Sequence, residues 1–162
     1  MILDVRHADD IGADPTSDSR HIGPFRLLRR IGCGGFGTVF EAWDARLGRA
    51  VALKLLHRPS EESRTQLLAE ARAAASLEHR AFVRVLEIVD EDGVLALVLE
   101  LVRGQTLAER LKQGPVPVAR ALDWTAELAQ AMAEAHRAGL VHGDLKPANL
   151  MIDLDKRLRI LD

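Results

Sequence analysis

The sequence of 162 residues has few of the features expected of a secreted, metal-rich or polyanion-binding protein. Its one cysteine, Cys33, cannot form an intrachain disulfide or a multi-thiolate metal site. The 22 basic and 24 acidic residues leave a net charge of -2, too little to attract nucleic acid or an anionic membrane. Aromatic residues are 4% of the chain and tyrosine is absent. We therefore expect no nucleic-acid partner, and we assign Trp43 and Trp124 to packing.

Long apolar runs are also missing. Segments such as Val94–Leu99 are only a few residues long, and Asp4, Asp9 and Asp10 stand where a signal peptide would need an apolar stretch. At 48% hydrophobic and 28% charged, the composition is that of a globular chain able to bury a core. We expect a cytoplasmic protein, or the cytosolic part of a longer chain, without a membrane segment.

The first half of the chain has a β-type pattern. Residues 1–21 are acidic, lack an apolar period and are predicted to be a disordered tail. Turn signals then separate five predicted strands, and a helical stripe at Ser60–Leu77 lies between the third and the fourth. The predicted strands are Phe25–Ile31, Thr38–Trp43, Ala50–Leu56, Val83–Val89 and Val94–Val102. We predict an α+β fold whose first lobe, residues 22–102, is a five-stranded antiparallel sheet with one helix.

The second half, residues 103–162, is predicted to be a partial helical lobe that follows a hinge at Glu100–Gly104 and stops early. Helices are expected over Thr106–Lys112 and Val118–Ala138, because Gly114 and Gly139 stand just beyond their ends. A short hairpin of Leu150–Ile152 with Leu158–Leu161 should follow.

The first chemical signal is the glycine-rich segment between the first two predicted strands. Gly32, Gly34 and Gly37 could let the backbone approach phosphates closely, because glycine has no Cβ. A dinucleotide-binding fingerprint requires a helix directly after the glycines, whereas a strand is predicted here. The alternative is a glycine-rich hairpin turn that binds nothing.

The second signal is Lys54, within an apolar strand. Burying an ammonium group is costly unless it meets an anion, and either a phosphate or the Glu70 carboxylate would serve. A purely structural ion pair is the alternative.

The third signal is the segment 141–151, which carries Asp144, Lys146 and Asn149 in a loop after the long helix. Phosphoryl transfer needs an acceptor that orients a hydroxyl, a cation near the γ-phosphate and an oxygen ligand for Mg²⁺, and these side chains supply all three. Asp162 follows the last predicted strand as a further carboxylate.

Together these motifs resemble a eukaryotic-type (Hanks-type) protein kinase domain, most closely the bacterial serine/threonine branch. The resemblance covers residues 22–162 and implies a bilobal, kinase-like fold. It implies that Lys54 holds the α- and β-phosphates and pairs with Glu70, and that the backbone of Glu100 and Val102 binds adenine beside the gatekeeper Leu99. The nucleotide-contacting residues would then be Ile31, Gly32, Gly34, Gly37, Val39, Ala52, Lys54, Glu70, Leu99, Glu100, Val102 and Met151.

For catalysis, the resemblance implies that Asp144 is the base and Lys146 the γ-phosphate contact. Asn149 and Asp162 would be the metal ligands. The implied reaction is ATP- and Mg²⁺-dependent transfer to Ser or Thr hydroxyls of a protein substrate, and a homodimer through the first lobe is a further expectation.

Two departures from the family keep other interpretations open. Gly143 replaces the usual arginine, and the resulting His-Gly-Asp also occurs in small-molecule phosphotransferases. The family continues beyond the position of Asp162, so we expect this chain to be a truncated domain, inactive by itself. The alternatives are a non-catalytic, pseudokinase-like nucleotide-binding remnant and a small-molecule phosphotransferase.

Overall fold

The computed structural model describes residues 20–34, 37–56, 61–91 and 93–161. The chain forms two compact units: unit 1 comprises Met1–Leu68 and Val85–Leu101, and unit 2 comprises Ala69–Arg84 and Val102–Asp162. The predicted tail lies outside the described residues, except for Arg20 and for His21, which belongs to a short strand, β1 (His21–Ile22).

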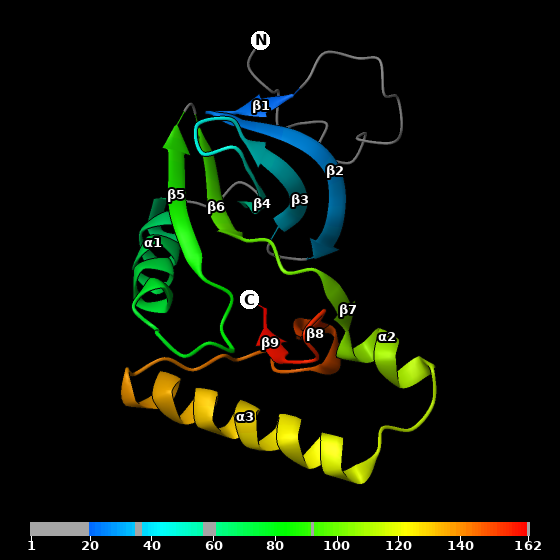
Figure 1. The fold of residues 1–162 in the computed structure, drawn as a ribbon. Helices are drawn as coiled ribbons and strands as arrows, with labels where there is room; N and C mark the ends of the chain where they lie inside the picture. The colour runs from blue at the N-terminus through cyan, green and yellow to red at the C-terminus, as the bar shows by residue number, and fades with distance from the viewer. Residues whose placement is uncertain (1–19, 35–36, 57–60, 92, 162) are drawn as a thin grey trace. The chain divides into compact units, whose positions relative to one another are not determined.

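Unit 1 contains an antiparallel sheet with the strand order β1-β2-β3-β4-β6-β5 (Figure 1). Its five longer strands are β2 (Phe25–Gly34), β3 (Gly37–Asp44), β4 (Arg49–Leu56), β5 (Val85–Glu91) and β6 (Val94–Glu100). The predicted five-stranded sheet is therefore confirmed, with β1 added at its edge. Several predicted bounds are wrong by two or three residues: β2 ends at Gly34 rather than Ile31, β5 spans Val85–Glu91 rather than Val83–Val89, and β6 ends at Glu100 rather than Val102.

The core of unit 1 lies on one face of this sheet. Phe40, Leu53 and Val98 are paired across β3, β4 and β6 and are almost completely buried. The β3–β4 turn is closed by Asp44, whose Oδ1 accepts hydrogen bonds from the backbone N–H groups of Arg46 (3.0 Å) and Leu47 (3.3 Å). Asp44 is only 1% exposed, so these bonds satisfy a carboxylate that would otherwise be costly to bury.

Helix α1 (Glu61–Ala75) is the one helix predicted in the first half of the chain. The boundary between the units falls inside it, after Leu68. The segment 69–84 therefore belongs to unit 2, although the sequence pattern assigned it to the first lobe.

Besides the segment 69–84 with the end of α1, unit 2 combines two helices with a small sheet of order β7-β8-β9. In chain order it contains β7 (Gly104–Thr106), α2 (Leu107–Lys112), α3 (Val118–Arg137), the 3-10 turn η2 (Pro147–Asn149), β8 (Leu150–Asp153) and β9 (Leu158–Ile160). The predicted helices and the β8–β9 hairpin are confirmed. Strand β7 was not predicted. It pairs so closely with β8 that a Cβ at Gly104 would overlap the carbonyl oxygen of Ile152, and glycine is therefore required there.

Helix α3 packs against this sheet through Trp124 and Ala131. Its partners in the core are Leu150, Ile152, Leu158 and Ile160, whose alternation along β8 and β9 directs them to one face. The packing role of Trp124 is confirmed, whereas that of Trp43 is wrong, because Trp43 is 37% exposed on β3. Within the described ranges, no helix combines the length and apolarity needed to span a membrane.

Candidate active site

The strand register of unit 1 brings several predicted nucleotide-contacting residues onto one face of the sheet. Lys54 pairs with Val39, Val39 pairs with Gly32, and Ala52 pairs with Leu99. Directly paired residues in an antiparallel sheet share a face, and so do residues two apart along a strand. These positions therefore lie opposite the Phe40–Leu53 core. Glu100 pairs with Val51 instead, so the Glu100 side chain belongs to the core face and only its backbone is available for the predicted adenine contact.

The three predicted phosphate-loop glycines differ in their surroundings. A Cβ at Gly37 would overlap the carbonyl oxygen of Leu55, so the pairing of β3 with β4 itself requires glycine there. A Cβ at Gly34 would meet no atom within 4 Å, and one at Gly32 would make ordinary contact with Val39. Packing among the described residues therefore requires glycine at position 37. It does not require glycine at positions 32 and 34, so a contact with a ligand would account for glycine there.

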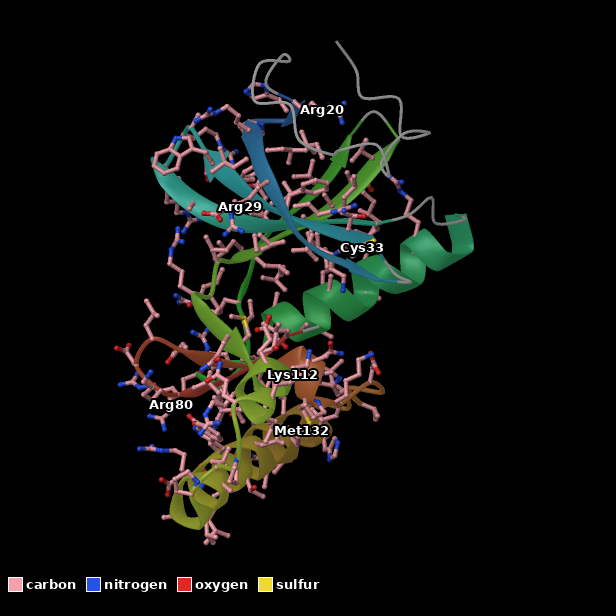
Figure 2. The ribbon with its side chains drawn as sticks, turned by 90° about the vertical axis from the view of Figure 1, so that its right-hand side faces the viewer. Arg20, Arg29, Cys33, Arg80, Lys112 and Met132 are labelled. Carbon is pink, nitrogen blue, oxygen red and sulfur yellow. The ribbon has the colours of Figure 1, made fainter. Side chains whose placement is uncertain are left out.

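Two further residues lie near the end of β2. Ile31, on β2, is 39% exposed. Cys33 is exposed on β2 (Figure 2), and its Sγ lies 3.8 Å from Thr38 Oγ1.

The predicted Lys54–Glu70 pair stays a prediction. Lys54 is half-buried in the middle of β4 in unit 1. Glu70 lies on α1 in the part assigned to unit 2, and its side chain is outside the described set.

The segment 142–149 of unit 2 brings together the two predicted catalytic residues, Asp144 and Lys146, and one predicted metal ligand, Asn149. Lys146 Nζ lies 2.6 Å from Asp144 Oδ2, and Asn149 Nδ2 donates to the same oxygen at 3.0 Å. Asn149 Nδ2 also donates to the backbone carbonyl of Asp144 at 2.9 Å. Turn η2 produces this approach, because the Asn149 N–H donates to the Lys146 carbonyl (2.9 Å) and folds the chain back.

Asp144 is a solvent-accessible carboxylate, with 53% of its side chain exposed. The hydrogen bond from Lys146 is the main cause that lowers its pKa below the usual value. The Asn149 hydrogen bond and the nearby positive charge act in the same direction, whereas partial desolvation opposes them. Asp144 is therefore ionised at neutral pH.

His142 anchors the loop through both ring nitrogens. Its Nδ1 accepts a hydrogen bond from the Asp144 backbone N–H at 3.4 Å, and its Nε2 lies 3.2 Å from the Leu161 carbonyl oxygen. The neutral tautomer protonated on Nε2 satisfies both contacts. The Leu161 N–H in turn donates to the Asn149 carbonyl at 2.8 Å. This backbone link between the loop and the end of β9 carries no side-chain signal, so the sequence could not reveal it.

Gly143 adopts a φ of 75° between these contacts. Residues with a Cβ are strained in this region, so the loop conformation itself favours glycine at the position where the resemblance expects arginine.

The remaining predicted residues of unit 2 are placed in part. Met151 lies on β8 between the buried Leu150 and Ile152, and its side chain therefore lies on the opposite face of the strand. Val102 precedes β7 and is half-buried. Asp162, the second predicted metal ligand, lies outside the described residues, so only Asn149 of that pair is placed.

Comparison with known proteins gives one family and a consistent set of relatives. The sequence profile of the family described as "Protein kinase domain" matches residues 25–162. The chain is 38% identical over 146 residues to the serine/threonine-protein kinase pkn2 of Myxococcus xanthus, covering 86% of this chain and 18% of that protein. It is 36% identical over 156 residues to the serine/threonine-protein kinase PknE of Mycobacterium bovis, covering 92% and 28% respectively. The chain thus spans less than a third of the length of these curated relatives.

Solved structures show the same fold. The PknI kinase domain of Mycobacterium tuberculosis superposes with a TM-score of 0.78 at 25% identity, covering 90% of this chain and 62% of that one. The structure described as the apo form of PpkA-294 has the same TM-score at 23% identity, covering 93% and 62%. The predicted kinase-like α+β fold and the resemblance to bacterial serine/threonine kinases are confirmed.

Proposed function

The chain belongs to the protein kinase family, and we therefore propose that it takes part in ATP- and Mg²⁺-dependent transfer of a phosphoryl group to serine or threonine hydroxyls of proteins. The choice of Ser/Thr is supported by the names of the relatives, which are serine/threonine-protein kinases. Lys146 supports it as well, because tyrosine kinases generally lack a lysine two residues after the base.

The arrangement around Asp144 is the observation that carries this proposal. Within the described part of the chain, Lys146 and Asn149 both donate to Oδ2 and leave Oδ1 without a side-chain donor. An ionised, accessible carboxylate oxygen in a fixed orientation can accept a hydrogen bond from a substrate hydroxyl. A carboxylate with a lowered pKa is a weak base, so Asp144 would mainly orient the hydroxyl and accept its proton as the new O–P bond forms.

The other predicted residues fit ATP and Mg²⁺. Asn149 donates through Nδ2, so its Oδ1 is a hard oxygen ligand of the type that Mg²⁺ prefers, and Asp162 would be the second ligand. When bound, Mg²⁺ neutralises charge that develops on the phosphate oxygens. Lys54 would hold the α- and β-phosphates, and Gly32 and Gly34, where the packing of the described residues does not require glycine, would let the backbone approach them. ATP as donor and the one free cysteine, Cys33, favour a cytoplasmic, reducing compartment.

The test is a phosphotransfer assay on the native gene product with labelled ATP, Mg²⁺ and dephosphorylated casein. Replacing Asp144 by Asn should lower the rate by roughly 100-fold or more, because the carboxylate that orients the hydroxyl is lost. Asp155→Asn, in the exposed turn between β8 and β9, is the matched control and should retain the wild-type rate. Phosphoamino-acid analysis should find phosphoserine or phosphothreonine.

Three outcomes would contradict the proposal. Full activity of the Asp144→Asn variant would remove Asp144 from the mechanism. Transfer to an aminoglycoside or an amino alcohol, with none to casein, would identify a small-molecule phosphotransferase. ATP binding without transfer to any acceptor would instead support the non-catalytic alternative.

A further inference from the structure

Unit 2 contains a cavity of about 510 Å³ that includes none of the proposed active-site residues. It lies where the β7–β8 pair, the end of α2 and the start of α3 meet. Its apolar lining includes Val116, Pro117, Trp124 and Ile152. This volume is within the usual range of ligand pockets, roughly 300–1,000 Å³.

The charged lining of this cavity is predominantly basic. Arg110 from α2, Arg120 from α3 and Lys156 from the β8–β9 turn line it, against one carboxylate, Asp153. Three cations from separate elements therefore meet around an apolar surface, although the whole chain carries a net charge of -2. Such a local excess attracts acidic groups.

The contacts of Arg110 and Arg120 leave most of this positive charge uncompensated. Arg110 donates to the carbonyl oxygens of Gly114 (3.1 Å) and Pro115 (3.5 Å), which orient the guanidinium without neutralising it. Arg120 lies 3.7 Å from Asp123, and both side chains are at least half exposed, so this ion pair is weak. The α3 helix also begins at the cavity, with Pro117 as an N-cap that makes no side-chain hydrogen bond and without an acidic residue in the first turn. The positive end of the helix dipole thus adds to the field.

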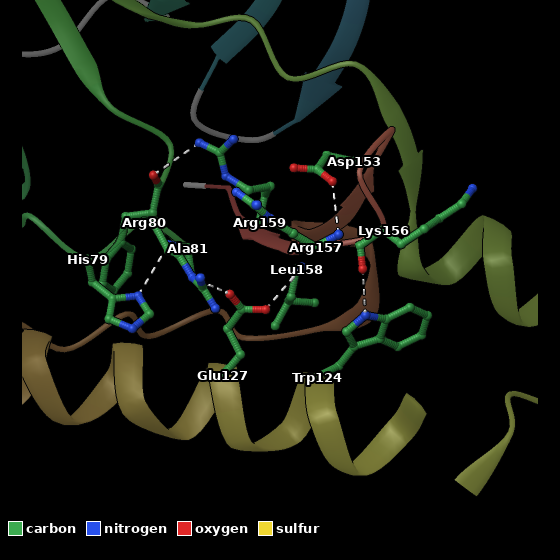
Figure 3. Close-up of polar contacts among 11 residues, drawn as sticks. His79, Arg80, Ala81, Trp124, Glu127, Asp153, Lys156, Arg157, Leu158 and Arg159 are labelled. Atoms are coloured by element: carbon green, nitrogen blue, oxygen red, sulfur yellow. Dashed lines mark hydrogen bonds and ion pairs between the residues drawn. The ribbon is translucent and has the colours of Figure 1, made fainter. Parts of the chain in front are cut away.

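Lys156 is held in place by its backbone. Its carbonyl oxygen accepts a hydrogen bond of 3.2 Å from Trp124 Nε1, and its N–H donates to the Asp153 carbonyl at 3.0 Å. Figure 3 shows the Lys156 ammonium extending away from the Asp153 carboxylate. Asp153 Oδ1 already accepts a hydrogen bond from the Arg157 N–H at 2.9 Å. The one lining carboxylate therefore does not neutralise this lysine.

We propose that this cavity is a docking site for an acidic peptide segment of a partner protein, with one apolar side chain in the cavity and flanking Asp or Glu residues against Arg110, Arg120 and Lys156. The apolar lining would bury the anchoring side chain, and the basic rim would select acidic neighbours and orient the peptide. A free inorganic anion would contact only the basic side chains and would leave the apolar lining unoccupied. This site is independent of the proposed phosphotransfer, because it shares no residue with it.

The test measures binding of a fluorescent peptide, one leucine flanked by glutamates, to the 162-residue chain by fluorescence anisotropy. A Trp43→Phe background leaves Trp124 as the only tryptophan, so its emission reports on the cavity directly. We expect saturable binding that weakens as salt is added. A peptide with serine in place of leucine should bind at least several-fold more weakly.

Charge reversal locates the site. The Arg120→Glu and Lys156→Glu variants should each weaken binding about tenfold or more, because like charges then face the peptide. Arg137→Glu, at the exposed far end of α3, is the matched control and should bind like the parent. If circular dichroism shows that a reversal variant does not fold, Arg120→Gln and Lys156→Gln replace it, with a smaller expected loss.

Three results would overturn the proposal. The first is the absence of saturable binding. The second is equal weakening by Arg137→Glu, which would mean non-specific attraction to any basic surface. The third is equal binding of the serine peptide together with full competition by inorganic phosphate, which would identify a small-anion site.

Discussion

Lys146 controls the protonation of Asp144, because its ammonium lies 2.6 Å from Oδ2 in an otherwise solvent-accessible loop. The pKa of Asp144 is lower in the folded chain than in the unfolded chain. The contact with Lys146 therefore contributes fully to stability above the unfolded-state pKa, and this contribution is lost as the pH falls through the folded-state pKa. We predict that Lys146→Met raises the pKa of Asp144 toward its usual value. Carbon-detected NMR titration of the aspartate carboxyl groups measures this directly.

The matched control is Lys156→Met in the same unit, which should leave the Asp144 midpoint unchanged because Lys156 makes no contact with that carboxylate in the described structure. An identical midpoint in the parent and both variants would show that Lys146 does not hold Asp144 in solution.

At the scale of the element, the β2–β3 hairpin contains glycines of two kinds. Gly37 is required by strand packing, whereas Gly32 and Gly34 are proposed to contact the phosphates of ATP. Gly37→Ala places a Cβ against the Leu55 carbonyl and should lower the free energy of unfolding by roughly 1–3 kcal/mol. Gly34→Ala meets open space, so its effect should stay within about 0.5 kcal/mol. Urea denaturation of the two variants measures this difference.

The same pair of variants tests the proposed phosphate loop. Gly34→Ala should weaken ATP·Mg²⁺ binding in isothermal titration calorimetry despite its unchanged stability, because the added methyl group would obstruct the phosphates. Unchanged ATP affinity would remove Gly34 from the nucleotide site, and equal stabilities of the two alanine variants would contradict the close approach at Gly37.

For the whole molecule, each unit has a hydrophobic core of its own, and the core of unit 2 is formed mainly by α3 and the short strands β8 and β9. Leu158 is 1% exposed between α3 and β8, so Leu158→Ala should cost about 2–5 kcal/mol of unfolding free energy. Leu154, on the same hairpin, is 71% exposed, so Leu154→Ala should change stability by less than about 0.5 kcal/mol. Thermal and urea unfolding, with hydrogen exchange at β8 and β9, measure both effects. Similar losses for the two variants would contradict the assignment of Leu158 to the core.

Much of the fold could be predicted because its signals are local. Strand alternation around Phe40 and Leu53, and the glycines that follow α2 and α3, depend on residues close in sequence. The spacing of Asp144, Lys146 and Asn149 is local as well, and one 3-10 turn is enough to bring them together. The family resemblance rested on these same short motifs, and the profile match confirms it.

The missed features depend on residues that are distant in sequence. Strand β7 has only three residues, and its pairing with β8 depends on a close approach at Gly104 that no periodicity signals. The exposure of Trp43 depends on which sheet face the core occupies, and the membership of 69–84 in unit 2 depends on tertiary contacts.

The sequence by itself determined the family, the order of the longer elements and the residue types of the proposed catalytic loop, because each depends on short-range patterns of residue type. Only the tertiary structure decided that Lys146 and Asn149 both donate to the same oxygen of Asp144. It likewise decided that Arg110, Arg120 and Lys156 surround one cavity. The physical reason is that distances between side chains, and their burial, are set when separate elements pack together. Local sequence patterns indicate the elements, but they do not indicate how those elements pack.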